Sequence, residues 1–485
     1  MKKLQVAIIG GGVIGSNIAF ELSRYNLEVA VFEKGIDVCS EISKANSGVI
    51  HSGINSAPGS LKARYCVEGN KVFQNLSEQL GFSLEFIGKY VIAKNQKEIK
   101  ELERLKEIGR KNNVPGLEIK KASEVKKIEP NVSCIAALWV PTAGIILPYE
   151  FTISLAENAA INKVKFYLET KVSDLEKQKD GFLIKTSNGD FKSDVVVNAA
   201  GLSSREIVSM LEEPNFQIFP CRGEYLVLDK RYSNLVNSMI YPVPEKELGV
   251  LGVHITPTIE GNILLGPSAE FIDDSKDKKT TKKNMQVLFS EAKEIIPNLP
   301  EKSVINAYSG IRCKLAPPEK GGWADYNIFD SKENPGFINL PGIESPGLTA
   351  SPAIAKDIVD MVSNYINIEK KKNFKIRKKE ERFNEMALGK QKKSIQEDGR
   401  WGRIVCRCEH ITEAEIINAL DNPLGARSIS SVKYRCRAGM GRCQGGFCTQ
   451  HIIRIMEEKI GMNISDIKFN NPNSNMFVGR TREEK

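Results

Sequence analysis

Two pairs of cysteines near the C-terminal end have the residue type and spacing to bind iron. The first pair is Cys406-Arg-Cys408, and the second is Cys443-Gln-Gly-Gly-Phe-Cys448. Four thiolates spaced as C-x-C and C-x4-C can hold one [2Fe-2S] cluster. Zinc sites usually carry C-x2-C-like pairs, so zinc is the competing interpretation. The spacing favours iron and predicts a protein that moves single electrons.

The residues around these cysteines agree with a cluster. Four glycines would let backbone amides approach the sulfur atoms: Gly439, Gly441, Gly445 and Gly446. Thr412 and Glu415 have the spacing of a capping box and predict a helix start just after Cys408. The tract from Arg437 to Cys448 resembles the BFD-like [2Fe-2S] domain of bacterial flavoenzymes. Cys436 lies outside the ligand spacing and is expected to be a buried side chain.

The N-terminal segment has the pattern of a dinucleotide-binding unit. An apolar run over residues 4–9 precedes Gly10, Gly12 and Gly15, and a second apolar run ends at Glu33. The glycines allow a tight turn that places a pyrophosphate on a helix N-terminus, and the acid can bind the adenosine ribose. This pattern alone fits FAD and NAD equally, but its N-terminal position favours FAD.

Later segments resemble the flavin-contact motifs of the D-amino-acid oxidase superfamily. They are the strand 194–198 with the following Ala200 and Gly201, the segment 342–352, and a shorter stretch ending at Val172. The resemblance implies FAD as cofactor. Asn46 and Ser47 follow the Glu33 strand closely and are expected near the flavin. From the last segment the predicted cofactor contacts are Gly342, Gly347, Leu348 and Thr349.

The order of these signals predicts the architecture. The fold class is α/β, with a doubly wound FAD-binding Rossmann-like domain, an interleaved antiparallel-sheet substrate domain and a small helical [2Fe-2S] domain. A substrate pocket is expected between the first two. The predicted boundaries are 1–85, 145–210 and 335–368 for the FAD domain, 86–144 and 211–334 for the substrate domain, 369–402 for a basic linker, 403–460 for the cluster domain, and 461–485 for a tail.

Composition limits where the protein works and what it binds. No apolar run is long enough for a transmembrane span. Ten cysteines without a disulfide-like pattern indicate a reducing compartment, so a cytoplasmic location is expected. Residues 370–393 contain 11 Lys and Arg against 3 Glu, a net charge of +8 in a chain of net +9. Such a segment can contact anionic lipid or a protein partner. A solvated linker is the simpler interpretation, and nucleic acid is not expected.

Two of the four histidines are candidates for proton transfer. Alternation over residues 251–256 puts His254 on a face with the small residues Gly252 and Thr256, which leaves room for a ligand. His51 follows the Glu33 strand and should lie near the flavin. From periodicity alone, a structural role for His254 is equally compatible.

Several segments resemble one family more closely. Residues 46–53, 58–69, 222–225, 240–244 and 251–256 are similar, in the same order, to those of L-2-hydroxyglutarate dehydrogenases and oxidases. That family oxidises the alcohol carbon of a 2-hydroxy acid by passing a hydride to flavin.

This chemistry needs a base and a cation. His254 is the first candidate for the base and His51 the second. Arg312 is the first candidate for binding the carboxylate, since a guanidinium grips a carboxylate or phosphate bidentately. Arg222 and Tyr225 are further predicted substrate ligands, although an arginine in a strand is often a structural ion-pair partner.

The predicted cluster domain is a departure from the 2-hydroxyglutarate enzymes, which generally lack it. Flavin domains joined to such a domain resemble instead the catalytic subunit of anaerobic glycerol-3-phosphate dehydrogenase, and some amino-acid and opine dehydrogenases. The sequence therefore predicts an FAD-dependent dehydrogenase acting on a small anionic secondary alcohol, with electrons leaving through the cluster to a redox protein or a companion flavoprotein subunit. An amino-acid dehydrogenase, an electron-transfer subunit without its own substrate, and a peripheral membrane contact remain open.

Overall fold

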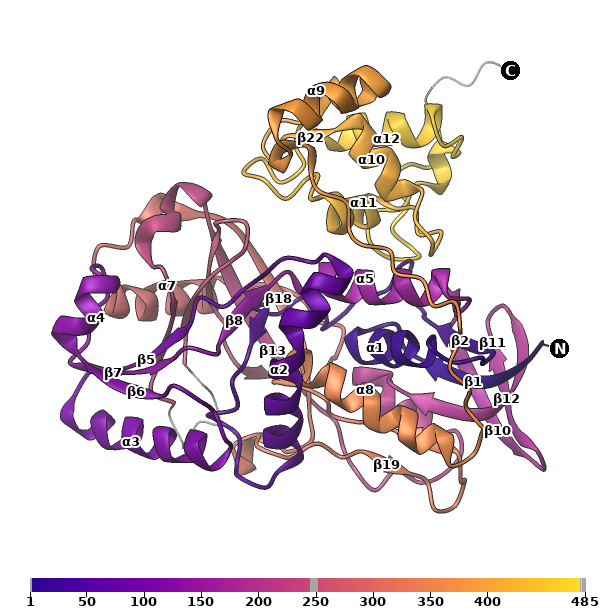
Figure 1. Ribbon diagram of the computed structural model, residues 1–485, viewed down its shortest axis with the longest axis horizontal. Helices are drawn as coiled ribbons and strands as arrows, with labels where there is room; N and C mark the ends of the chain where they lie inside the picture. Colours follow the sequence, from indigo (N-terminus) through magenta and orange to yellow (C-terminus); the bar gives the residue numbers. More distant parts are fainter. Residues whose placement is uncertain (1, 245–251, 480, 482–485) are drawn as a thin grey trace.

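The structure is a computed structural model that describes residues 2–244, 252–479 and 481. These residues form two mixed α/β parts side by side and a smaller, mainly helical C-terminal part that lies against one of them (Figure 1). The predicted fold class, α/β with an interleaved second sheet and a small helical domain, is confirmed. The chain passes between the two α/β parts more than once, as an interleaved architecture requires.

The first sheet carries the dinucleotide-binding pattern. Its central strand β1 (Lys2–Ile9) pairs in parallel with β2 (Val29–Phe32) on one side and with β12 (Gly189–Asn198) on the other. Residues 6–9 are buried, as expected for a parallel strand covered on both faces. The other strands are β9 (Lys165–Tyr167), β10 (Val172–Gln178), β11 (Gly181–Thr186), β19 (Phe329–Asp330) and β20 (Phe337–Asn339).

Helices pack on this sheet around α1 (Val13–Leu22). This helix is apolar on almost every side and packs against α5 (Pro148–Ile161) and α8 (Gly347–Ser363). The long helix α2 (Leu61–Leu80) packs on the outer side of α8. The short helix α6 (Ser204–Val208) follows β12. The residues that lead into α1 and α8 are therefore held by a rigid core.

The second sheet forms the other α/β part. Apart from the parallel pair β14–β5, its neighbouring strands are antiparallel. The strand order is β17 (Glu270–Phe271), β13 (Phe219–Leu228), β16 (Ile263–Gly266), β15 (His254–Pro257), β14 (Met239–Pro242), β5 (Lys89–Ala93), β7 (Ala136–Val140) and β6 (Glu118–Lys121), with β18 (Val304–Lys314) also on β13. Its helices are α3 (Gln96–Lys111), α4 (Ala122–Ile128) and α7 (Lys282–Ile295).

A small sheet lies where the two α/β parts meet. It contains β3 (Val49–Ile50), β8 (Gly144–Ile146) and β4 (Leu84–Glu85). Because β3 leads directly into His51, this sheet fixes the backbone of that predicted site residue between the two larger sheets.

The C-terminal part has its own apolar core. Ile416, Val432, Ile452 and Met456 are buried in it. The predicted capping box is present, since the Glu415 carboxylate accepts the Thr412 N–H at 2.8 Å. Its elements are α9 (Leu388–Glu397), β21 (Ile404–Cys406), β22 (Ile411–Thr412), α10 (Glu413–Leu420), α11 (Ile429–Cys436) and α12 (Thr449–Glu458).

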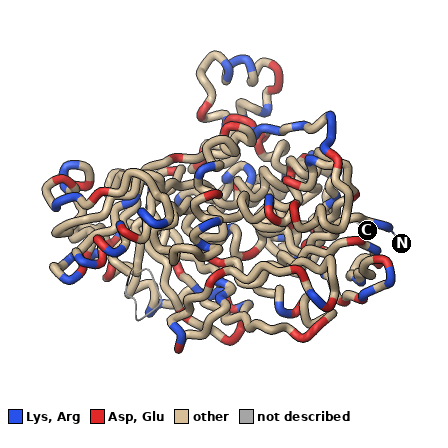
Figure 2. Tube along the Cα trace, turned by 60° about the horizontal axis from the view of Figure 1, so that its bottom comes forward, with Lys and Arg blue, Asp and Glu red and all other residues tan. Residues whose placement is uncertain are grey.

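The basic segment 369–402 is packed on the protein: residues 369–379 run along the flavin domain, and the rest, with α9, belongs to the C-terminal part. The Lys371 ammonium donates to the Asn162 carbonyl at 2.6 Å, and the Asn158 and Asn162 side chains bind its backbone. Lys379 forms an ion pair with Glu150. Cations and acids are interspersed over the described chain (Figure 2). Within that described part, no helix combines the length and the apolar content of a membrane span.

Candidate active site

The glycine turn opens the N-terminus of α1 towards a large cavity. Gly10 has φ +109°, a conformation that favours glycine, and a Cβ on Gly15 would lie 2.0 Å from the Gly10 carbonyl oxygen. Gly12 is the N-cap residue of α1 and has no side chain to cap the helix. The Val13 N–H donates to the Ser43 hydroxyl at 2.8 Å. Such a helix start, with its N–H groups and positive dipole end, suits a phosphate.

Glu33 lies at the end of β2, where the dinucleotide pattern predicts it. Its carboxylate accepts the N–H groups of Gly11 at 2.8 Å and Gly35 at 2.7 Å. Burial raises the pKa of Glu33, although these two N–H groups stabilise the charged form. The carboxylate is thus held on the glycine turn, where it can meet a ribose.

Most of the predicted cofactor contacts line this cavity, whose volume is about 1570 Å³. That is larger than the roughly 300–1,000 Å³ of ordinary small-molecule pockets and suits an extended dinucleotide together with a substrate. Gly15, Gly342 and Thr349 are predicted contacts that do not line it. The predicted residues that line it are Gly10, Gly12, Glu33, Asn46, Ser47, Val172, Ala200, Gly201, Gly347 and Leu348.

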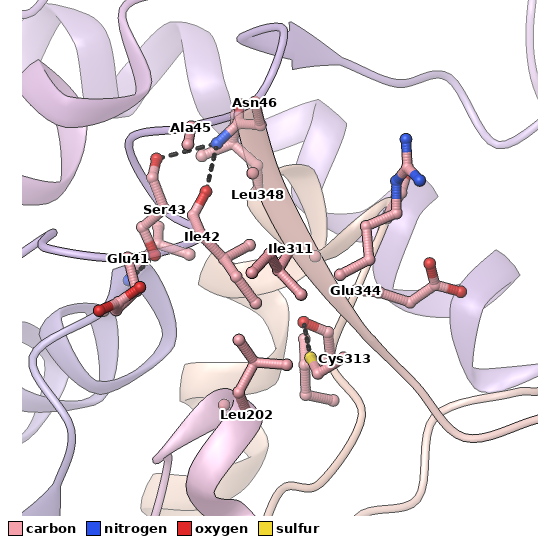
Figure 3. A pocket seen from close by; sticks show the side chains of 18 of the residues that line it. Glu41, Ile42, Ser43, Ala45, Asn46, Leu202, Ile311, Cys313, Glu344 and Leu348 are labelled. Atoms are coloured by element: carbon pink, nitrogen blue, oxygen red, sulfur yellow. Dashed lines mark hydrogen bonds between the residues drawn. The ribbon is translucent and has the colours of Figure 1, made fainter. Parts of the chain in front are cut away.

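A fixed loop brings the flavin domain against the second sheet. The Asn46 amide donates to the carbonyls of Ile42 at 3.1 Å and Ser43 at 2.9 Å (Figure 3). A Cβ on Gly310 of β18 would lie 2.0 Å from the Ala45 carbonyl oxygen, so only glycine permits this approach. The cavity wall therefore combines residues of both α/β parts.

His51 lies where the predicted flavin segments meet the substrate part. Its backbone N–H donates to the Thr349 hydroxyl at 2.8 Å. Thr349 therefore holds the backbone of His51 and does not itself line the cavity. Its Nε2 is 3.4 Å from the Ser345 hydroxyl. Burial, and then the charge of Lys89, lower the pKa of His51 to about 3. The imidazole is therefore neutral at physiological pH, and in the free protein it is a weak base; an anionic substrate beside it would raise its pKa.

His254 lines the same cavity from β15. Its ring stacks on Tyr241 with a centroid separation of 3.5 Å. Gly252 also lines the cavity, whereas Val253 and Ile255 lie in the core, as the alternation predicts. Leu251, which belongs to the same predicted pattern, lies outside the described residues. The structure thus brings both candidate histidines to one cavity.

Arg312 is half-buried in the cavity wall on β18. Its guanidinium donates to the Ser268 carbonyl at 3.0 Å and to the Cys221 sulfur at 3.4 Å. A Cβ on Gly223 would lie 2.6 Å from Arg312 Nη2, so the absence of a side chain there makes room for the guanidinium. Arg312 makes no ion pair with any described residue. Tyr225 lies beside it and lines the cavity as well.

Arg222 does not line the cavity, so the prediction that it binds substrate is corrected. Strand alternation turns Arg222 away from the face of Gly223 and Tyr225. Its guanidinium pairs with Glu270 at 2.6 Å and Asp277 at 2.8 Å. Arg222 is a structural ion-pair partner, because its side chain is 1% exposed and matched by acids.

Lys89 is a cavity residue that the sequence pattern does not single out. It begins β5, is 1% exposed, and holds its ammonium 4.6 Å from the centre of the Tyr241 ring. It makes no ion pair with the residues that the structure describes. Burial lowers its pKa from 10.5 to about 8. The sequence signal that could have identified it is a lysine directly before the apolar run 90–93.

A nearby acid is matched by two lysines. The Glu344 carboxylate lies 2.8 Å from the Lys62 ammonium and 3.4 Å from that of Lys314. Burial alone would raise the pKa of Glu344, but these two charges lower it. Glu344 also interacts with the charge of Arg312, but one carboxylate cannot balance Lys62, Lys314, Arg312 and Lys89 together, so this end of the cavity has an excess of positive charge.

The predicted cluster ligands form two thiol pairs. Cys406 hydrogen-bonds with Cys448, and Cys408 hydrogen-bonds with Cys443. The first pair is buried and the second is exposed. Over the described residues, no three His, Cys, Asp or Glu side chains converge on a single-ion site. Two pairs fit a two-iron cluster better than one zinc ion, which needs its ligands together.

Backbone amides and glycines shape this cluster site. The N–H groups of Gly439 and Glu409 donate to the Cys406 sulfur, and that of Phe447 lowers the pKa of Cys443. A Cβ on Gly441 would lie 2.2 Å from the Cys408 Cβ. Cys436 is buried in the domain core, as predicted. The donor set and its amides fit a [2Fe-2S] cluster.

Comparisons with known proteins agree with both sites. Residues 5–361 match the family described as FAD dependent oxidoreductase, and residues 404–458 match the BFD-like [2Fe-2S] binding domain. The chain belongs to the family of FAD-dependent oxidoreductases. The predicted cofactors, FAD and a [2Fe-2S] cluster, and the predicted enzyme class are confirmed.

Individual relatives narrow the comparison. A glycerol 3-phosphate dehydrogenase from Caloramator mitchellensis is 41% identical, over 99% of both chains. An L-2-hydroxyglutarate dehydrogenase from Indibacter alkaliphilus is 30% identical, over 73% of this chain and 98% of its own. The solved L-α-glycerophosphate oxidase of Mycoplasma pneumoniae with FAD bound has a TM-score of 0.72 at 33% identity, covering 77% of this chain and 98% of that one.

Proposed function

We propose that the protein is a glycerol 3-phosphate dehydrogenase that passes its electrons through the [2Fe-2S] cluster to a redox protein. The observation that carries this proposal is the Caloramator relative, which is similar over 99% of both chains and therefore over the C-terminal domain too. The 2-hydroxyglutarate and oxidase relatives match about three quarters of this chain.

The charge of the cavity supports a phosphate ester. Lys89 is buried and Arg312 is half-buried, neither forms an ion pair with a described residue, and Glu344 is already paired with two lysines. A phosphate monoester carries about −1.5 to −2 charge at pH 7 and can accept several charge-assisted hydrogen bonds. We assign Arg312 and Lys89 to its recognition, with Tyr225 beside them.

His51 is the proton acceptor that we favour. It contacts Ser345 and Thr349, which belong to the predicted flavin segment, and it is neutral before substrate arrives. His254 has one ring face covered by Tyr241. When bound, FAD supplies the acceptor for the hydride. The alcohol O–H gives its proton to His51 as the C–H hydride leaves, and the secondary alcohol becomes a ketone.

L-2-Hydroxyglutarate is the second candidate substrate, because the Indibacter relative matches the flavin and substrate parts. It too is a small anion with a secondary alcohol. The deciding experiment compares kcat/KM for the two substrates in the absence of oxygen, with an artificial one-electron acceptor. We expect a preference of about 100-fold or more for glycerol 3-phosphate, because a site built for one polar group rejects another. A preference for L-2-hydroxyglutarate would overturn the proposal.

A further inference from the structure

The cavity crosses the boundary between the flavin domain and the cluster domain. Ser430, Lys433 and Tyr434 of α11 and the segment 469–473 line it together with the glycine turn and Glu33. In Figure 1, α11 is the helix of the C-terminal domain that lies against α5. A cofactor in this cavity would therefore meet residues of both domains.

Strong contacts hold α11 in this position. Arg435 forms ion pairs with Asp37 and with Glu157, the latter at 2.8 Å. Tyr434 packs on Tyr149 with ring centres 5.1 Å apart. Further along the chain, Lys468 pairs with Glu169 beside the segment that lines the cavity. The side chains that α11 presents to the cavity are therefore positioned by the folded structure.

Lys433 differs from the other cations of this helix. Arg435 is matched by Asp37 and Glu157, and Arg437 lies 3.0 Å from Glu409 and 3.3 Å from Glu260. Lys433 has no such acid among the described residues, and the same is true of Lys44 on the opposite wall. Burial, and then the charges of Lys44 and Arg437, lower the pKa of Lys433. Two like charges that line one cavity favour an anion near them.

The position of Lys44 indicates which anion this is. Lys44 follows Ser43, whose hydroxyl accepts the Val13 N–H at the start of α1. That helix start is the phosphate-binding end of the dinucleotide pattern. The Lys44 ammonium also lies 5.3 Å from the centre of the Tyr434 ring, which places it next to α11.

We propose that Lys433 of the cluster domain, together with Lys44, binds the diphosphate of FAD, so that FAD joins the two domains. A cofactor that contacts both domains raises the equilibrium constant for their docking. By linkage, docking raises the affinity for FAD by the same factor. FAD then strengthens a docked arrangement that ion pairs of Arg435 and Lys468 already favour.

The test measures cofactor affinity in the full-length protein with its cluster intact. The protein is freed of FAD, and the dissociation constants of FAD, ADP and adenosine are measured for wild type and Lys433→Met. We expect FAD and ADP to bind about tenfold or more weakly to the variant, since a charge-assisted hydrogen bond is lost. Adenosine, which lacks phosphates, should bind equally to both. Lys459→Met, at the exposed end of α12, should match wild type.

Two other results would overturn the proposal. Unchanged affinities for FAD and ADP would mean that Lys433 does not meet the diphosphate. Weaker FAD binding with unchanged ADP binding would place Lys433 at the flavin or the cluster instead. Should Lys433→Met lose its cluster absorbance, Lys44→Met on the other wall gives the same comparison.

Hydrogen exchange supplies a readout independent of affinity. FAD should protect the backbone of α11 and of residues 469–473 in the wild type. This protection should be lost in Lys433→Met at FAD concentrations that saturate it. Equal protection in the variant would contradict a coupling between FAD and docking through Lys433.

Discussion

The two faces of the paired strands β13 and β18 hold arginines in different surroundings, one buried and one half-buried. On one face, Arg222 is matched by Glu224, Glu270 and Asp277. On the other, Arg312 faces the cavity, and its hydrogen-bond partners among the described residues are neutral: the Ser268 carbonyl, the Cys221 sulfur and Tyr225. The side chains are of the same type and lie on neighbouring strands, yet within the described residues only Arg222 forms ion pairs.

This difference separates a structural cation from a binding one. A buried charge is unfavourable unless it is paired, so Arg312 is stabilised when an anion enters the cavity. Two lysines of the cavity show the same contrast. Lys62 is paired with Glu344 at 2.8 Å, whereas Lys89 forms no ion pair with a described residue. Substitutions on the cavity face should therefore reduce activity, and substitutions on the opposite face should reduce stability.

The largest effect is expected from the base on the cavity face. His51→Asn should lower kcat by about 100-fold to 10,000-fold, the usual contribution of general base catalysis. His254→Asn, the matched control in the same cavity, should lower it by less than about tenfold. The measurement is anaerobic steady-state kinetics with FAD content checked. A larger loss of kcat in His254→Asn than in His51→Asn would identify His254 as the base.

The two arginines give the most direct contrast. Arg312→Ala should lower kcat/KM by about 30-fold to 4,000-fold, corresponding to about 2–5 kcal/mol for a buried charge contact. Arg222→Ala should instead lower the free energy of unfolding by about 3–5 kcal/mol, because it leaves buried acids unmatched. Its kcat/KM, measured on folded protein, should stay near that of wild type. Activity loss without destabilisation in Arg222→Ala would contradict the contrast.

Lys89→Met should separate function from stability in one variant. Loss of a charge-assisted contact should raise KM for glycerol 3-phosphate about tenfold to 100-fold. The substrate-free variant should be more stable below pH 8, by about 3 kcal/mol, because burial lowers the pKa of Lys89 from 10.5 to about 8. Chemical unfolding and steady-state kinetics check the two parts. A destabilised variant would mean that Lys89 has a structural partner.

The smallest expected effect is a pH dependence of the same residue. Above pH 8 the Lys89 ammonium loses its proton in the free enzyme, so KM should rise with pH by up to about tenfold per unit. The wild type should also gain stability between pH 8 and 10.5, since the unfolded chain binds the extra proton there. Both trends should be absent in Lys89→Met. A KM that is flat from pH 7 to 10 in the wild type would count against Lys89.

Local patterns in the sequence predict much of the site. The glycine turn and Glu33 depend on neighbouring residues, and the cysteine spacing identifies the four thiols, so both could be predicted; the pairing of Cys406 with Cys448 and of Cys408 with Cys443 could not. The alternation around His254 also predicts its cavity face. The same rule applied to Arg222 and Tyr225 would have placed them on opposite faces.

Long-range packing explains what could not be predicted. Lys89 becomes a cavity residue only because β5 pairs with β14 and meets Tyr241. The segment 469–473 lines the cofactor cavity only because α11 docks on the flavin domain. The local sequence of 469–473 does not carry that information, and for Lys89 it offers only a lysine at the head of an apolar run. The basic segment is fixed by Asn158 and Asn162, which lie far from it in the chain.

The most direct test of the account is an anaerobic titration with glycerol 3-phosphate, followed by flavin absorbance and the EPR signal of the cluster. The account predicts that the flavin band bleaches and that the reduced-cluster signal appears with it. It also predicts that Arg312→Ala shows neither change at the same substrate concentration while its FAD content is unchanged. Bleaching by L-2-hydroxyglutarate and not by glycerol 3-phosphate, or flavin reduction without any cluster signal, would contradict it.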